Sequence, residues 1–130
     1  MSYSIKRAAE LSALSAKMIR YYEGVGLIRD VSRSESGYRS YTEQDIHTLK
    51  FIKRSRDLGF SVKQIEELLA LWNDRLRASS EVKKVAGGHL EKLKKKRAEL
   101  DQMINVLEHL VCHCHGDQRP DCPILGELGG

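Results

Sequence analysis

The chain has 130 residues, the usual length of about one domain, and its apolar and aromatic fractions of 41% and 6% support only a modest core. We therefore expect a second subunit to cover the apolar surface of any long exposed helix. The formal net charge of +4, from 22 basic and 18 acidic residues, is compatible with nucleic-acid binding without proving it. No stretch is apolar enough to span a membrane and no signal-peptide core is found, so we expect a cytoplasmic protein with reduced thiols.

Two short helices are predicted near the start of the chain. Residues 5–11 place apolar side chains on or near one face, and residues 16–23 form a second helix that Ser15 can cap and Gly24 or Gly26 can end. A connection of about three residues between two short helices is typical of a helix-turn-helix. In that motif the second helix enters the major groove of DNA.

The outward face of this second helix is predicted to carry Lys17, Arg20 and Tyr21. Arginine can bond bidentately to guanine edges, and lysine amines and tyrosine hydroxyls can reach phosphates, so these residues are candidate DNA contacts. The alternative is an ordinary solvated helix face, and this helix alone does not decide between the two.

A hairpin is predicted over residues 33–41, because a central Ser-Gly pair is a turn signal flanked by residues that tolerate a strand. Arg33, Tyr38 and Arg39 surround this turn. The hairpin therefore looks like a wing that can lie against phosphates or reach a minor groove. The alternative is a surface hairpin whose tyrosines pack on the domain.

Two further helices are predicted before a break in the pattern. Thr42 and Asp45 match a helix-start pattern, and the helix runs over residues 43–58 until a glycine ends it. Ser61 can cap a fourth helix whose apolar residues extend to Trp72, and an Asn-Asp pair then starts a break. The apolar faces of both helices are predicted to point into the core.

A heptad pattern dominates residues 80–111, where Leu93, Leu100 and Leu107 recur every seven residues beside a companion row. A helix of about 30 residues would be about 45 Å long, and it would leave an apolar stripe exposed in a monomer. We interpret it as a dimer helix. A Gly-Gly pair at 87–88 is unusual within a helix and indicates a bend, a close helix approach or a later helix start.

All three cysteines, Cys112, Cys114 and Cys122, lie in one short segment after this helix, together with His113 and His115. Thiolates are soft ligands and imidazoles borderline ones, so the segment suggests a soft-metal site. An odd cysteine count in a reducing compartment favours metal or redox chemistry over a disulfide framework. The remaining histidines are interpreted as ordinary helix residues: His47, His89 and His109.

Catalytic motifs are missing from this sequence. It has no glycine-rich phosphate loop, no nucleophile elbow and no paired carboxylates in an evident pocket. We therefore expect a binding protein rather than an enzyme.

Several of these segments resemble one known family. The DNA-binding domain of MerR-family transcription regulators is similar to residues 16–23 (AKMIRYYE), 26–28 (GLI) and 33–41 (RSESGYRSY). The resemblance continues through residues 58–61 (LGFS) and the heptad helix, and it covers almost the whole chain. Within the family the chain looks most like the CueR type, the copper-efflux regulators and related gold sensors. That narrower resemblance rests on the seven residues between Cys114 and Cys122, on the Pro-Ile pair that follows, and on Ser79 before the dimer helix.

The resemblance implies a mainly α fold in three parts: a winged helix-turn-helix DNA-binding and linking region over residues 1–75, a long antiparallel coiled-coil dimerisation helix over 76–111, and a metal-binding loop with a tail over 112–130. It implies a homodimer that binds double-stranded promoter DNA with an overlong spacer. Effector binding then bends and untwists that DNA, so that bound RNA polymerase can initiate. Carried over residue by residue, the DNA contacts fall on Lys17, Arg20, Tyr21, Arg33, Tyr38 and Arg39, and the metal ligands fall on Cys114 and Cys122.

The donor set favours a soft monovalent ion, because Cu(I), Ag(I) and Au(I) accept two thiolates. Cu(I) is the leading prediction, and the sequence does not rank the three. In divalent and mercury sensors of the family, a cysteine at the start of the dimer helix contributes from the partner subunit. Ser79 matches that place here, and a serine hydroxyl is a poor soft ligand.

Three alternatives stay open. A zinc or other divalent site can add Cys112 and a histidine to the two cysteines. Otherwise Cys112 is the last helix residue, packed as a small apolar group, and His113 and His115 face solvent or lie next to the ligands. A thiol redox sensor can use Cys112 and Cys114. A metallochaperone can bind another protein in place of DNA.

Overall fold

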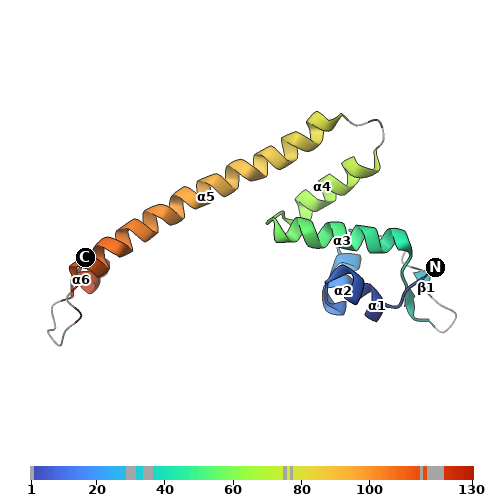
Figure 1. Cartoon of the computed structure of the whole chain (residues 1–130), viewed down its shortest axis with the longest axis horizontal. Helices are drawn as coiled ribbons and strands as arrows, with labels where there is room; N and C mark the ends of the chain where they lie inside the picture. Colours follow the sequence, from blue (N-terminus) through green and yellow to red (C-terminus); the bar gives the residue numbers. More distant parts are fainter. Residues whose placement is uncertain are drawn as a thin grey trace. The chain divides into compact units, whose positions relative to one another are not determined.

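The computed structural model describes residues 2–28, 32–33, 37–74, 76, 78–114, 116 and 122–130. Its elements, in chain order, are α1 (Ile5–Ser12), α2 (Ala16–Gly24), β1 (Ser32–Arg33), β2 (Arg39–Ser40), α3 (Glu43–Asp57), α4 (Val62–Asn73), α5 (Ser79–His113) and α6 (Pro123–Gly129) (Figure 1). The predicted mainly helical fold is confirmed. The chain divides into two compact units, residues 1–85 and 86–130, which we describe separately.

Serine caps begin the two helices of the helix-turn-helix. The Ser4 hydroxyl accepts a hydrogen bond from the backbone N–H of Arg7 at 3.2 Å, and the Ser15 hydroxyl accepts one from Met18 at 3.1 Å. Such caps satisfy backbone donors that lack a partner inside the helix. Between the helices Ala13 takes a left-handed conformation with φ of 63°, which turns the chain back on itself. The short predicted connection is therefore present.

The predicted hairpin is present at its base. β1 and β2 pair antiparallel, with Ser32 opposite Ser40 and Arg33 opposite Arg39. The backbone of Tyr3 also pairs with that of Tyr41, through two hydrogen bonds of 2.7 and 2.8 Å. The N-terminal segment is thus hydrogen-bonded to the chain where the hairpin ends. Residues 34–36 of the predicted turn lie outside the described residues.

Capping boxes start α3 and α4. In the first, the Thr42 hydroxyl accepts from the Asp45 N–H at 3.1 Å and the Asp45 carboxylate accepts from the Thr42 N–H at 2.9 Å. Ser61 and Gln64 repeat the arrangement at the start of α4. Gly59 follows α3 with φ of +87°, a conformation that side chains disfavour. These local signals explain why the predicted bounds of both helices are close to those observed.

The core of the first unit lies among its helices and the base of the hairpin. Its largest fully buried side chains are Tyr22, Tyr41, Ile19, Leu49, Ile52 and Ile65. α1 packs against both α2 and α3, and Val82 and Val85 from the first turns of α5 pack on the same core. Full burial of one such aliphatic side chain contributes about 1.5–3 kcal/mol, so this small core holds the helix-turn-helix in place.

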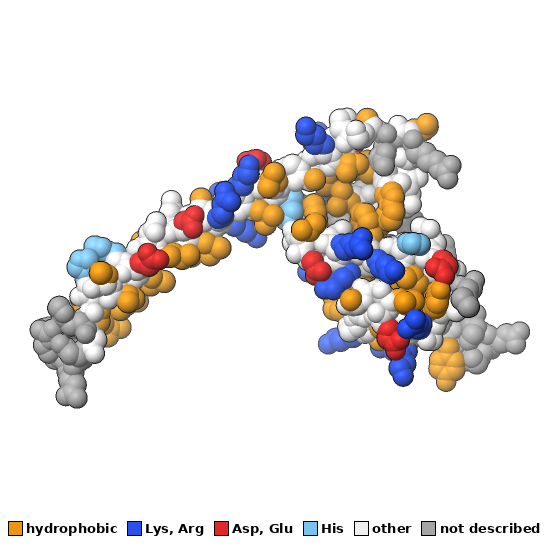
Figure 2. Space-filling model, in the orientation of Figure 1, with side chains coloured by type: hydrophobic (Ala, Val, Ile, Leu, Met, Phe, Trp, Pro, Cys, Tyr) orange, Lys and Arg blue, Asp and Glu red, His pale blue; other side chains and the backbone are white. Residues whose placement is uncertain are grey.

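The second unit consists of most of α5 and the short helix α6. α5 has 35 residues and continues through Gly87 and Gly88, so the glycine pair neither ends the helix nor delays its start. At 1.5 Å per residue it is about 52 Å long. Residues of the predicted seam are exposed along it: Leu93 is 42%, Leu100 56% and Leu107 52% exposed, and Figure 2 shows a row of apolar side chains on this helix. Among the described helices, none is long and apolar enough to cross a membrane.

α6 was not predicted, because two glycines occur among its seven residues and weaken the helical pattern. It begins directly after Cys122, with Pro123 at the first helical position, where proline is well tolerated. The tail after the proposed loop is therefore ordered as a helix.

Candidate DNA-binding surface and metal loop

α2 presents the residues that were predicted to contact DNA. Ile19 and Tyr22 are buried on its inner face. Lys17, Arg20 and Tyr21 are exposed on the opposite side. Within the described part of the chain, neither Lys17 nor Arg20 forms an ion pair in this structure. The geometry therefore leaves two cations and one phenol on the helix that a helix-turn-helix inserts into the major groove.

Glu23, at the end of α2, connects this helix to the hairpin. Its carboxylate accepts a hydrogen bond from Arg39 Nε at 2.7 Å and another from the Tyr41 hydroxyl. Glu23 is only 13% exposed in its side chain, so solvent screens the pair weakly. Burial, and then the hydrogen bond to Glu23, raise the pKa of Tyr41 above its ordinary value, so the phenol stays protonated and donates.

The predicted wing residues differ in how exposed they are. Tyr38 is 75% exposed, and Arg39 is one-third exposed and paired with Glu23. Arg33 lies in β1 opposite Arg39, and its side chain lies outside what the structure describes. The sequence did not predict that Glu23 binds Arg39 and Tyr41. The available signal was an acidic residue that lies in the chain between the predicted basic DNA contacts.

Basic side chains also gather on α3, and Figure 2 shows Lys and Arg at the surface of this first unit. Lys53 pairs with Asp57 at 2.8 Å, and Arg56 donates to the Phe60 carbonyl at 2.9 Å. These two cations thus have structural partners. Lys50 and Arg54 are exposed on the same helix and add to the positive charge of the unit.

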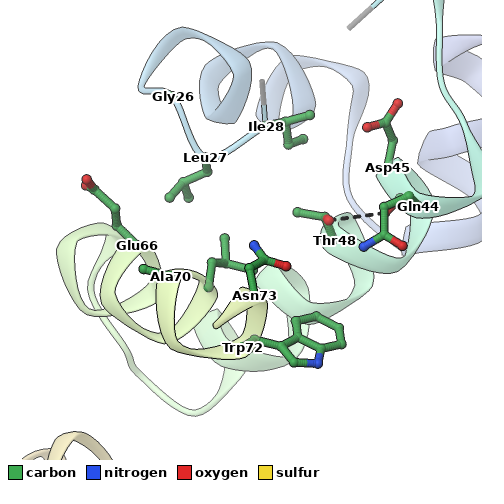
Figure 3. A pocket seen from close by; sticks show the side chains of 11 residues that line it. Gly26, Leu27, Ile28, Gln44, Asp45, Thr48, Glu66, Ala70, Trp72 and Asn73 are labelled. Carbon is green, nitrogen blue, oxygen red and sulfur yellow. Dashed lines mark hydrogen bonds between the residues drawn. The ribbon is translucent and has the colours of Figure 1, made fainter. Parts of the chain in front are cut away.

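A hollow of about 440 Å³ lies between the segment after α2, the first half of α3 and one side of α4 (Figure 3). Asp45 and Glu66 contribute carboxylates to its lining, and Thr48 donates its hydroxyl to the Gln44 carbonyl at 3.1 Å beside it. Two acidic groups make this hollow unsuitable for a DNA phosphate. It is therefore distinct in chemistry from the basic face of α2.

The cysteines lie where α5 ends and α6 begins. Cys114 follows the last residue of α5, and its N–H donates to the Val111 carbonyl at 3.1 Å. Cys122 directly precedes α6, and its carbonyl accepts from the Gly126 N–H at 2.9 Å. Both are partly buried free thiols, whereas Cys112 is an exposed free thiol on α5. The backbones of both predicted ligands are therefore hydrogen-bonded to the adjoining helices.

The other residues predicted near the metal are distributed as follows. His113 is the exposed last residue of α5, and Ser79 is the exposed first residue of the same helix. His115 and residues 117–121, between the two cysteines, lie outside the described residues. Within the described ranges, no three His, Cys, Asp or Glu side chains form a group that could hold a metal ion. Two thiols at the ends of a short loop fit a soft ion that needs few ligands.

Family comparison decides what kind of protein carries these features. A family model described as "MerR HTH family regulatory protein" matches residues 3–72, more than half of the chain, and one described as "MerR, DNA binding" matches residues 46–110. The chain belongs to the MerR family. This MerR-family chain is 57% identical over 125 residues to "Heavy metal-dependent transcription regulator 2" of Rhizobium meliloti (strain 1021), covering 96% of the chain and 85% of the relative.

Two further comparisons concern metals. The MerR-family chain is 42% identical over 127 residues to "HTH-type transcriptional regulator CueR" of Vibrio cholerae, covering 98% of the chain and 91% of the relative. Among solved structures, it is similar to the transcription regulator PbrR691 from Ralstonia metallidurans CH34 in complex with lead(II). That match has a TM-score of 0.84 and 27% identity, and covers 97% of this chain and 98% of the other.

Family membership confirms the predicted class of protein. The MerR-type helix-turn-helix is present, and the family consists of transcription regulators, which are not enzymes. The exposed cations on α2 belong to the segment that the first family model matches.

Proposed function

We propose that this chain is a cytoplasmic, metal-responsive transcription activator that binds promoter DNA as a homodimer and responds to Cu(I), or to Ag(I) or Au(I), through Cys114 and Cys122. The observation that carries the proposal is the pair of partly buried thiols that flank a short loop at the end of a long helix, in a chain whose first unit is a MerR-type helix-turn-helix. Relatives named for heavy metals and for CueR support the metal response.

DNA binding is proposed for the outer face of α2 and the wing. Arg20 and Lys17 are exposed, and Tyr21 lies beside them. An arginine on this helix can bond two acceptors of one guanine, and the lysine neutralises a phosphate. Tyr38, Arg33 and Arg39 would contact the backbone from the wing.

The homodimer is proposed from α5. A helix about 52 Å long with a row of half-exposed leucines is unstable as a solitary surface element, because water is left against its apolar side. An antiparallel coiled coil with a second copy would bury that side. Such a dimer would place two copies of α2 on successive half-sites of one promoter.

The chemistry of the loop supports a monovalent ion. Two thiolates and one such ion leave a net charge of −1, which a cationic or polar surrounding can offset. The exposed Ser79 at the start of α5 is a weak ligand for soft metals, so a third sulfur donor from a partner's α5 start is not available.

Metal binding would act by population shift. The ion stabilises the conformation in which the dimer bends and untwists its promoter, and RNA polymerase bound there then initiates. A ligand changes this equilibrium only through its different affinity for the two states. Holding Cys114 and Cys122 together is the proposed source of that difference.

A promoter-fusion assay tests the site. Cys114→Ser or Cys122→Ser should abolish induction by copper while operator binding in a gel shift persists, because the thiols are remote in sequence from α2. Arg20→Ala should instead weaken operator binding itself at fixed salt. Full copper response in either cysteine variant would disprove the assignment of ligands.

A divalent alternative is supported by the lead(II) complex of the similar structure and by the exposed Cys112. X-ray absorption on the anaerobically loaded protein distinguishes the two. Two sulfur neighbours indicate Cu(I) on Cys114 and Cys122, whereas a four-ligand sulfur and nitrogen shell indicates a zinc-like site that includes Cys112.

A further inference from the structure

The last turns of α5 carry a pair of histidines that the proposed thiolate site does not use. His109 and His113 are four residues apart, so they are neighbours on one face of the helix. Both are exposed, and Figure 2 shows histidine side chains at the surface near the end of α5. Their ring centroids are 4.1 Å apart and their planes are inclined by 39°. The two imidazoles are therefore already close and accessible from solvent.

A hydrogen bond fixes which nitrogen of His113 is available. His113 Nδ1 lies 2.8 Å from the backbone carbonyl oxygen of His109. A carbonyl oxygen can only accept, so Nδ1 carries the hydrogen, and in the neutral ring Nε2 is the nitrogen with the lone pair. Histidines that bind metals almost always donate their other N–H to such a partner, because the bond holds the ring and the tautomer. The hydrogen bond already holds the His113 ring in an orientation that suits a metal ligand.

We propose that His109 and His113 form a binding site for a divalent ion such as Ni(II) or Zn(II), separate from the two thiolates. Imidazole nitrogen suits both ions. Two histidines at this spacing on one helical face are also how zinc-binding helices supply two ligands. Within the described ranges no third His, Cys, Asp or Glu joins the pair, so water completes the coordination.

The position on the helix also favours a cation. His113 is the last residue of α5, where the final backbone carbonyls lack partners inside the helix. These carbonyls give the C-terminal end a partial negative charge, which stabilises positive charge nearby. The chain would then bind two kinds of ion at one end of α5: a soft monovalent ion on sulfur and a borderline divalent ion on nitrogen.

The test uses the untagged full-length chain with Cys112→Ser, Cys114→Ser and Cys122→Ser, so that sulfur does not compete. Ni(II) binding is measured by titration calorimetry near neutral pH. Either His109→Gln or His113→Gln should weaken Ni(II) binding at least about tenfold. Replacing a residue that only hydrogen-bonds to a metal ligand typically costs about that much, so loss of a ligand itself should cost no less. The control is His47→Gln, which removes a solitary exposed histidine of α3 and should leave the affinity unchanged.

A second measurement avoids the cysteine substitutions. In the wild-type chain with alkylated thiols, substoichiometric paramagnetic Ni(II) should broaden the ring resonances of His109 and His113 before those of His47. Equal Ni(II) affinity in the parent and in the His109→Gln/His113→Gln double variant, or uniform broadening, would overturn the proposal. Neither readout involves copper, so its failure is distinct from a failure of the Cu(I) response.

Discussion

Glu23 joins two parts of the DNA-binding unit that are 16 residues apart in the chain. One oxygen of its carboxylate accepts from Arg39 and the other from the buried Tyr41 hydroxyl. Hydrogen bonds to an ionised group are roughly twice as strong as neutral ones. This one side chain therefore links the end of α2 to the base of the hairpin.

Glu23→Ala should destabilise the folded chain by about 1–3 kcal/mol, because the buried Tyr41 hydroxyl loses its acceptor. Urea denaturation of the full-length protein measures this loss. Glu10→Ala is the matched control, since Glu10 pairs with Arg7 only at the exposed surface and should change the midpoint little. Equal midpoints for the two variants would show that Glu23 has no such role.

For single residues, the sequence predicted which side chains are exposed, but it did not predict which side chains bond to each other. Its pattern correctly placed Lys17, Arg20 and Tyr21 on the exposed side of α2, because helical periodicity separates the two faces. It assigned Arg39 to DNA without its ion pair, and it missed the hydrogen bond between His113 and His109. Contacts that depend on side-chain rotamers or on distant segments are not encoded in local patterns.

Helix caps are the element-scale devices that position the first unit. α1 and α2 begin with single serine caps, whereas α3 and α4 begin with reciprocal capping boxes. These signals occupy a few adjacent residues, which is why the bounds of these helices could be predicted. α6 has no capping side chain and contains two glycines, so no local sequence signal predicted this helix.

Thr42→Ala should lower stability by about 0.5–2 kcal/mol, since it removes the hydroxyl that accepts from the Asp45 N–H. Thr48→Ala provides the control in the same helix. Its hydroxyl only bonds back to the Gln44 carbonyl, and alanine is the better helix former by up to about 0.7 kcal/mol. Thermal denaturation should show a lower midpoint for Thr42→Ala only, and a loss in both variants would contradict the capping argument.

At the scale of the whole molecule, the main question is what covers the exposed apolar side of α5. The predicted seam residues are half-exposed in the single chain, and the pattern that revealed them is a seven-residue period visible in the sequence. The sequence did not show that the helix continues through Gly87 and Gly88. Each glycine costs on the order of 1 kcal/mol relative to alanine, so burial of the apolar side must offset that cost.

Leu100→Glu should shift the protein toward monomer, because it places a charge in the centre of the proposed seam. Sedimentation velocity measures the shift, and operator affinity should fall with it because a monomer contacts one half-site. Ala98→Glu lies about 160° away around the helix, on an exposed position, and should leave the dimer intact. A monomeric parent chain, or dimers of equal affinity in both variants, would contradict the proposed interface.

The Glu23 contact has a consequence for changing the DNA sequence that such a protein recognises. Transplanting only the outer residues of α2 from a relative would place them on a helix that Glu23 still links to the recipient's own Arg39 and Tyr41. The smallest portable module is therefore α2 together with β1, β2 and Tyr41, moved as one piece with Glu23 inside it. Chimaeras designed at this boundary would keep the helix and the wing in register on their new operator.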